Sequence, residues 1–194
     1  MVQLKQQFQS FEDYLAYDDG TENLYELFNG ELIEVPPESG FNVEIATLLL
    51  IEFARQVGYR QVRGHGLELE VRGEPKNRYP DLTVIYAEQV DLLRRRNTVR
   101  ISMGPPILVA EIFSPGEVQR NRDDIAKRSQ YQDLGIPEYW IIDPQEATVL
   151  VLELRDGVYG EAATFRGGER VRSPQLGPLD VAAQALFGAA ASEK

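Results

Sequence analysis

Three parts of the chain carry apolar residues at helical spacing beside residues that cap or end helices. The clearest is residues 42–58, NVEIATLLLIEFARQVG, which predicts an amphipathic helix that ends at Gly58. Its apolar face consists of Ile45, Leu48, Leu49 and Phe53. Residues 121–135, NRDDIAKRSQYQDLG, predict a second helix closed by Gly135. A short helix is expected after Ser10, which can cap it.

Strand patterns dominate the rest of the chain. LYELFNGELIEVPPES alternates apolar and polar residues around an Asn-Gly pair, which predicts a β-hairpin. Further strands are expected at LELEV (67–71), DLTVIYA (81–87), PILVAEIFS (106–114), EYWIIDP (138–144), ATVLVLEL (147–154) and VYGEAATF (158–165). Because strands come in groups with helices inserted early and in the middle, the order favours an α/β (α+β) fold around a mixed sheet.

Two carboxylates occur where a buried strand is expected to begin or end. Asp81 follows Pro80, which lacks a backbone N–H and is best placed at the start of a strand. Glu111 lies near the far end of the apolar run ILVAEIF. If the two strands are neighbours, both carboxylates emerge at one rim of the sheet, where repulsion favours a bound cation such as Mg²⁺. The alternative is that Asp81 caps a turn and Glu111 pairs with an arginine.

The helix expected at residues 121–135 brings a lysine into this picture. Asp123, Lys127 and Tyr131 are spaced by four and Leu134 follows by three, so they share one stripe. Tyr131 and Leu134 are suited to burial, which turns Lys127 toward the core, where it would orient a water or stabilise developing charge. The alternative, a surface pair between Asp123 and Lys127, would contribute about 0.2–0.5 kcal/mol.

Composition and charge limit the classes of function. The 194 residues include 31 Asp and Glu against 20 Lys and Arg, a formal net charge of −11, which disfavours non-specific attraction to nucleic acid or anionic membrane. There is no cysteine, and therefore no disulfide framework or thiolate metal site. We expect one domain over residues 1–188 and a loose tail over residues 189–194. No apolar run is long enough for a bilayer span or a signal peptide, so we also expect a cytoplasmic location without membrane contact.

Two other features are first interpreted as structural. The basic run LLRRRNTVR (92–100) is the only dense one, and a charge run of this kind is typical of a solvated loop or helix end. The single histidine, His65, lies between two glycines and is expected in a turn, because no second histidine or cysteine accompanies it for a zinc site.

Several segments resemble the Uma-type family of restriction-endonuclease-like proteins. YPDLTVI, PPILVAEIFSPG, RDDIAKRSQYQDLGIPEYWIIDP and the late SPQLGPLDVAAQALF occur in the family's order, and GIPEYWIIDP is the most specific piece. The family is placed in the PD-(D/E)xK nuclease superfamily. The resemblance implies a mixed central sheet flanked by helices, additional antiparallel strands, and Mg²⁺- or Mn²⁺-dependent hydrolysis of DNA. It also implies a homodimer, for which the last two predicted strands would supply an edge.

The resemblance carries roles over to individual positions. Asp81 matches the motif aspartate and Glu111 the acid of the (D/E)xK element, and with the backbone carbonyl of Ile112 they would hold the metal. Glu31, one of three acids around the hairpin turn, matches the first acidic position. Phosphate contacts would come from Arg94, Arg95, Arg96, Arg120 and Arg122.

The chain departs from the family pattern at two places. The superfamily lysine should stand two residues after Glu111, but that position is Phe113. The family resembles superfamily members in which this lysine lies on the next helix, and Lys127 stands at that place. The family also shows a histidine after its first proline-containing loop, where this chain has Phe41 and Asn42. Phe113 and the net charge of −11 favour an alternative, a non-catalytic relic of the nuclease fold that acts as a dimeric binding or regulatory protein.

Overall fold

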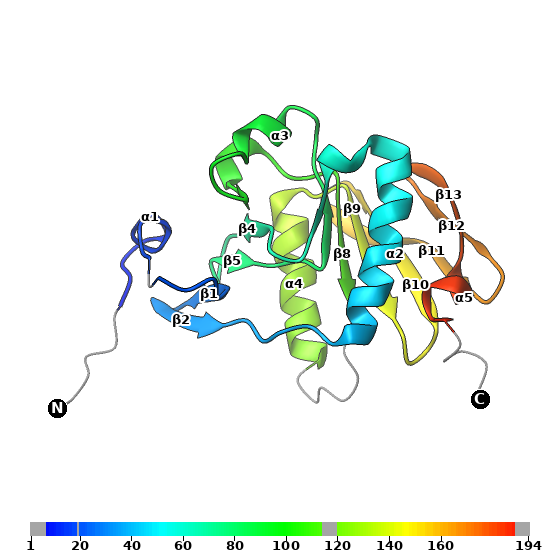
Figure 1. Cartoon of the computed structure of the whole chain (residues 1–194), viewed down its shortest axis with the longest axis horizontal. Coiled ribbons are helices and arrows are strands. Elements are labelled where there is room, and N and C mark those ends of the chain that lie inside the picture. The colour runs from blue at the N-terminus through cyan, green and yellow to red at the C-terminus, as the bar shows by residue number, and fades with distance from the viewer. Residues whose placement is uncertain (1–6, 19, 114–119, 189–194) are drawn as a thin grey trace.

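A six-stranded mixed sheet forms the centre of the chain (Figure 1). The computed structural model describes residues 7–18, 20–113 and 120–188, with the backbone alone at residues 120–123. The strand order is β11-β10-β9-β8-β6-β3, in which β8 and β9 run parallel and all other pairs run antiparallel. The strands are β3 (Val62–Gly64), β6 (Leu82–Val84), β8 (Leu108–Ile112), β9 (Glu138–Asp143), β10 (Thr148–Arg155) and β11 (Val158–Arg166).

The two long helices cover opposite faces of this sheet. Helix α2 (Gly40–Val57) packs its Ile45 and Phe53 with alternate residues of β8, among them Ala110. Helix α4 (Arg120–Leu134) packs against the other face, where the intervening residues of β8 point. Because side chains alternate along a strand, every residue of β8 is buried, as its nearly continuous apolar sequence predicts.

The N-terminal part of the chain adds a helix and a hairpin beside the sheet. Helix α1 (Phe11–Leu15) is capped by the Ser10 hydroxyl, which accepts a hydrogen bond from the Asp13 amide. Strands β1 (Tyr25–Phe28) and β2 (Glu31–Glu34) pair antiparallel, and the backbone φ angles of 49° and 80° at the Asn-Gly turn are those that this hairpin type requires. The predicted helix cap and hairpin are therefore confirmed.

The remaining elements are short and surround the centre. A three-stranded sheet has the order β5-β4-β7, and β12 and β13 form a separate hairpin. These elements are β4 (Glu68–Glu70), β5 (Asn77–Arg78), α3 (Gln89–Leu92), β7 (Thr98–Val99), β12 (Arg170–Ser173), β13 (Gly177–Ala182), α5 (Ala183–Leu186) and the 3₁₀ turns Tyr59–Gln61 and Ile101–Met103. The β12–β13 hairpin and α5 extend the apolar cluster under α2.

The architecture confirms the predicted mixed sheet flanked by helices with additional antiparallel strands. One prediction is corrected: β10 cannot supply an edge for a partner, because β9 and β11 pair with it on both sides, and only β11 is an outer strand at that end. The tail at residues 189–194 lies outside the described residues. No helix among the described residues is long and apolar enough to span a membrane.

Candidate active site

The first two predicted site residues lie on neighbouring strands. Strands β6 and β8 pair antiparallel with Leu82 opposite Ala110, and the same register continued by one residue sets Asp81 opposite Glu111. Both acids are buried, with 6% and 5% of their surface exposed. The site lies at the end of β8 between the first turns of α2 and α4 (Figure 1). The predicted convergence of two carboxylates at one rim is therefore present in the structure.

Helix α4 supplies two partners for Glu111. The Lys127 ammonium donates to Oε2 of Glu111 at 2.8 Å, and the Tyr131 hydroxyl donates to Oε1 at 2.6 Å. Burial and the Glu111 charge raise the pKa of Tyr131 well above its usual value, so Tyr131 remains a neutral donor. The buried carboxylate is thus compensated by a lysine from the predicted stripe, and no arginine whose side chain is described pairs with it. The side chain of Asp123 lies outside the described residues.

Asp81 is held differently, by the backbone of its neighbouring strand. Its Oδ2 accepts a hydrogen bond of 2.6 Å from the Ile112 amide. Burial first, and the nearby Glu111 charge second, raise the pKa of Asp81 to about 8. The Ile112 carbonyl accepts a contact of 3.4 Å from Asn42 Nδ2, and Ile112 lines the same cavity as Asp81. Asp81 therefore sits in surroundings that disfavour its charge unless a cation is bound.

These side chains open into a cavity of about 260 Å³. Six of its described lining residues are carboxylates and two are cations, Arg78 and Lys127. The carboxylates are Glu26, Glu34, Glu38, Asp81, Glu111 and Asp124. An excess of carboxylate oxygens in a partly enclosed space is the ligand set that divalent cations such as Mg²⁺ take in proteins. The cavity therefore fits a divalent metal ion better than it fits an anion alone.

The structure also brings in two residues that the sequence did not single out as ligands. His65 lies in the turn between β3 and β4, as predicted, and its imidazole also lies close to the carboxylates of Glu38 and Asp81. One ligand atom from each of the three residues lies within 4.8 Å of the others. No periodicity links positions 38, 65 and 81, and only the tertiary fold places them together. Asn42, one of the two residues that stand where the resemblance implies a histidine, is buried and donates to Glu38.

Glu31 is the predicted metal ligand that the structure does not bring to the site. It pairs with Phe28 at the turn end of the hairpin and does not line the described cavity. Glu26 and Glu34, nearer the other end of the same hairpin, do line it. Acids of this hairpin reach the cavity, but the residue chosen from the resemblance is not among them.

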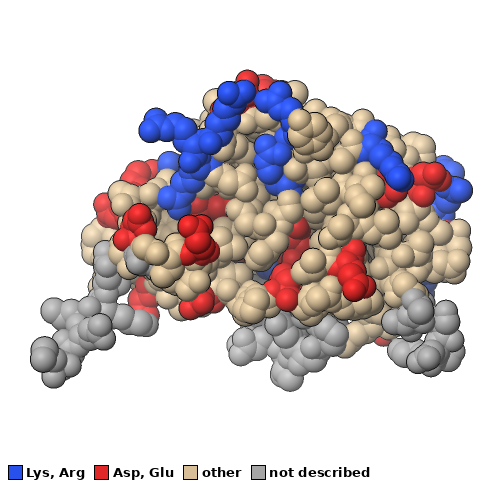
Figure 2. Space-filling view, in the orientation of Figure 1, with Lys and Arg blue, Asp and Glu red and all other residues tan. Residues whose placement is uncertain are grey.

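Three of the predicted phosphate-binding arginines, Arg94, Arg95 and Arg96, are not among the residues that line the described cavity. The run 94–96 follows α3 at the end of the sheet remote from the Asp81 rim (Figure 1). Figure 2 shows Lys and Arg gathered over this region, with acidic side chains prominent lower on the same face. Arg94 forms an exposed ion pair with Asp91. Arg120 and Arg122 have side chains outside the described residues. Nucleic-acid contacts by these five residues stay a prediction.

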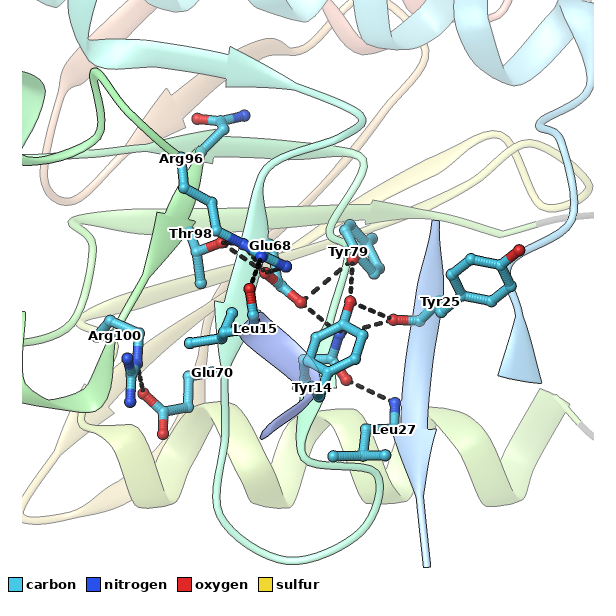
Figure 3. Close-up of polar contacts among 12 residues, drawn as sticks. Tyr14, Leu15, Tyr25, Leu27, Glu68, Glu70, Tyr79, Arg96, Thr98 and Arg100 are labelled. Carbon is cyan, nitrogen blue, oxygen red and sulfur yellow. Dashed lines mark hydrogen bonds and ion pairs between the residues drawn. The ribbon is translucent and has the colours of Figure 1, made fainter. Parts of the chain in front are cut away.

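Arg96 belongs to a buried polar network centred on Glu68 (Figure 3). The Glu68 carboxylate accepts hydrogen bonds from Asn77 Nδ2 at 2.7 Å and from the Tyr79 hydroxyl at 3.2 Å. Thr98 donates to it as well, and Arg96 lies 3.3 Å away. Since Tyr79 also lines the candidate cavity, the network fixes one wall of the site.

Comparisons with known proteins bear on the family and the fold of the chain. The model of the Uma2 family, described as "Putative restriction endonuclease", matches residues 11–185. Among solved structures, the chain is similar to "a putative nuclease belonging to DUF820" from Anabaena variabilis, with 20% sequence identity and a TM-score of 0.66. The match covers 92% of this chain and 97% of that one, and at this identity it shows a shared fold. No curated protein matches the chain.

Proposed function

The chain belongs to the Uma2 family of restriction-endonuclease-like proteins, and we propose that it is a metal-dependent endonuclease that hydrolyses phosphodiester bonds of DNA. The observation that carries the proposal is the convergence of Asp81, Glu111 and Lys127 from three distant segments on one acidic cavity. An isolated ion pair would not require a second carboxylate on the neighbouring strand. A second carboxylate is consistent with a hydrolytic metal site, where Mg²⁺ is usually held by one or two carboxylates.

Asp81, Glu111 and the Ile112 carbonyl would hold the Mg²⁺ or Mn²⁺ ion. The ion, when bound, lowers the pKa of a water and offsets charge on the scissile phosphate. The residues present fit such an ion, because Asp81 and Glu111 are buried and repel each other while one cation, Lys127, pairs with Glu111. The amide of Ile112 orients the Asp81 carboxylate through its 2.6 Å hydrogen bond.

Lys127 would take the catalytic role of the superfamily lysine, which is expected at position 113 but is replaced there by Phe113. Its ammonium lies 2.8 Å from Glu111 and lines the cavity, from where it can position a water or stabilise charge that develops on a phosphate oxygen. Phe113 packs against the apolar cluster on the α4 face of the sheet. A lysine supplied by α4 thus serves the same cavity from a different element.

The proposal is tested by incubating the purified chain with plasmid or single-stranded DNA in Mg²⁺ or Mn²⁺. We expect cleavage that EDTA abolishes and that Asp81→Asn or Lys127→Met lowers by about 100-fold or more, as loss of one electrostatic stabiliser typically does. Asp180→Asn is a matched control, because Asp180 is an exposed acid on β13. Cleavage that persists in Asp81→Asn would not depend on this site and would refute the proposal.

A homodimer is part of the proposal, since cutting both strands of a duplex calls for two sites. The exposed outer strand β11 is the edge at which two sheets would pair. Light scattering on the purified chain should give twice the monomer mass of 21.9 kDa. A monomer at micromolar concentration would remove this part of the proposal.

The second candidate function is a non-catalytic relic that keeps the fold. Phe113 at the expected lysine position and the predominance of acids in the cavity favour it, because both weaken contacts to a phosphate. Calorimetry separates the two: a nuclease binds Mg²⁺ or Mn²⁺ in a manner that depends on Asp81 and Glu111. A relic need not bind a cation there, so heat that is unchanged in Asp81→Asn supports the relic.

A further inference from the structure

The cluster of Glu38, His65 and Asp81 has a different donor set from the Asp81–Glu111 pair. We infer that it forms a second cation position, which takes a divalent first-row transition metal ion in preference to Mg²⁺. The inference rests on the proposed function in that Asp81 is shared between the two positions. It adds a ligand, His65, and a metal class that the Asp81–Glu111 pair alone does not imply.

The three residues come from three separate segments, and the fold places them around one point. Glu38 immediately precedes Ser39, the N-cap of α2; His65 lies in the turn after β3; and Asp81 precedes β6. Their ligand atoms lie within 4.8 Å of one another. Bonds of about 2.0–2.2 Å to a central ion place opposed ligand atoms slightly closer than that. Small side-chain rotations therefore suffice to close the site.

Protein cations balance this cluster less directly than they balance Glu111. Both oxygens of Glu111 have partners, the Lys127 ammonium and the Tyr131 hydroxyl. By contrast, no lysine or arginine among the described residues forms an ion pair with Asp81 or Glu38. Two neighbouring carboxylates without a counterion are costly to desolvate, and a divalent cation would remove that cost.

Unused ligand atoms remain on each member of the cluster. Asp81 is 6% exposed, and its one hydrogen bond with the described part of the chain engages Oδ2 and leaves Oδ1. Glu38 accepts a contact from Asn42 at 3.2 Å through one oxygen. The imidazole of His65 makes no hydrogen bond with any residue in the described ranges, and its nitrogens are available as ligands.

The position also lies where a metal ion would be accessible and partly desolvated. Glu38, His65 and Asp81 line both the main cavity and a smaller one of about 130 Å³ along α2. The walls of the smaller cavity are largely apolar and include Ala46 and Leu50. An apolar wall on one side strengthens the attraction between the ion and its ligands, because the local dielectric is lower than in water.

The donor set decides the class of ion. Carboxylate oxygens alone suit Mg²⁺, whereas an imidazole nitrogen shifts preference toward first-row transition metals, whose affinities for mixed nitrogen and oxygen sites rise from Mn²⁺ toward Cu²⁺. Mg²⁺ retains water in preference to nitrogen ligands. The Glu38–His65–Asp81 position should therefore bind Mn²⁺ more tightly than Mg²⁺.

Pulsed electron paramagnetic resonance on the full, tag-free chain with Mn²⁺ tests the inference. His65 is the only histidine in the sequence, so an imidazole ¹⁴N coupling to Mn²⁺ can arise from no other residue. We expect this coupling in the wild type and its loss in His65→Gln. We also expect His65→Gln to lower Mn²⁺ affinity about tenfold or more, since even partners that only orient ligands contribute 10–100-fold. The same substitution should change Mg²⁺ affinity less.

His65 is exposed in a turn, so its replacement should leave the fold intact, and unchanged circular dichroism verifies this. Glu38→Gln should weaken Mn²⁺ binding as well, whereas the exposed-acid control Asp180→Asn should not. Absence of imidazole coupling at saturating Mn²⁺ overturns the inference. If Mg²⁺-dependent cleavage persists without that coupling, the proposed function stands and only the inference fails. Coupling without any cleavage supports the inference and refutes the nuclease.

Discussion

Among the individual residues, Asp81 is an acid whose charge is disfavoured both by burial and by a neighbouring carboxylate. Its pKa is raised from 3.8 to about 8 in the folded protein without metal. Below pH 3.8 both the folded and the unfolded chain hold the proton. As the pH rises from 3.8 toward 8, the unfolded chain loses its proton while the folded chain retains it, so stability falls until the folded pKa is passed.

This shift predicts a pH-dependent effect of Asp81→Asn. In EDTA, the variant should match the wild type near pH 4 and exceed it increasingly toward pH 8.5, by on the order of 2 kcal/mol after allowance for relaxation. That corresponds to a rise of about 4–8 °C in melting temperature for a chain of this size. Calorimetry in EDTA across this pH range measures the difference. A difference that does not change with pH would contradict the assigned ionisation.

The contact between Lys127 and Glu111 predicts strong coupling between two substitutions. Lys127→Met leaves the buried Glu111 carboxylate without its cation and should lower the free energy of unfolding by about 2–4 kcal/mol. This is less than the cost of breaking a fully buried ion pair, because the Lys127 side chain is partly exposed. Glu111→Gln in the same chain should restore part of that loss, with a coupling energy of at least about 1 kcal/mol. Urea unfolding of the two single variants and the double variant measures it. Strictly additive effects would show that the pair is not formed.

The predicted and the missed site residues differ in the kind of signal that they leave in the sequence. Glu111 interrupts an apolar strand, and Lys127 stands one helical turn before the buried Tyr131, so a period of two or of 3.6 points to each of them. Glu38 and His65 lie in a loop and a turn, where no period applies. Their role depends on which loops meet at the rim of the sheet, and that is a property of the tertiary fold.

At the scale of elements, Asn77 joins the N-terminal hairpin to the rest of the fold. Its Oδ1 accepts a hydrogen bond of 2.7 Å from the Leu27 amide of β1, and its Nδ2 donates to Glu68 and to the Tyr25 carbonyl. The residue is fully buried. The β1–β2 hairpin, which contributes acids to the cavity, is thus anchored to β5 through Asn77, in addition to the ion pair between Arg78 and Glu26.

Asn77→Ala should therefore loosen this hairpin selectively. Two backbone groups and one carboxylate lose a buried partner, at a cost of about 1–3 kcal/mol for each group left unsatisfied. We expect faster hydrogen exchange at the Leu27 amide, with exchange on β8 and β9 little changed. Asn97→Ala is a control, because Asn97 binds the Gly66 carbonyl instead. Equal protection of Leu27 in both variants would contradict this role for Asn77.

Element length explains which parts of the fold the sequence predicts. Helices α2 and α4 span 18 and 15 residues, and both contain enough turns for an apolar face or stripe to repeat. Strands β5 and β7 have two residues each, which is too short for any alternation to be recognised. Strand β6 covers three residues of a seven-residue apolar segment, because the chain leaves the sheet after Val84. Long elements can be recognised from the periodicity of their own sequence, whereas these short strands form only by pairing with segments distant in the chain.

At the scale of the whole molecule, the distribution of charge separates the candidate cavity from the basic surface. The chain carries a net charge of −11, and acids outnumber cations in the described cavity lining. Lys and Arg gather instead over the α3 region (Figure 2). A phosphate entering the cavity would meet repulsion from Glu38 and Glu111 unless a divalent cation had already bound. DNA binding at the site should therefore depend on metal.

Fluorescence anisotropy with a labelled oligonucleotide tests this dependence. Carboxylates also bind Ca²⁺, and one bound ion would neutralise two of the carboxylate charges that repel the DNA phosphates. We therefore expect the oligonucleotide to bind at least about tenfold more tightly in Ca²⁺ than in EDTA. Asp81→Asn should reduce the difference. If the basic run also contacts the backbone, Arg95→Ala should weaken binding uniformly across sequences and lower the salt slope by about one. Equal affinity in Ca²⁺ and EDTA would show that DNA binds only at the basic surface, and the acidic cavity would then have no role in holding it.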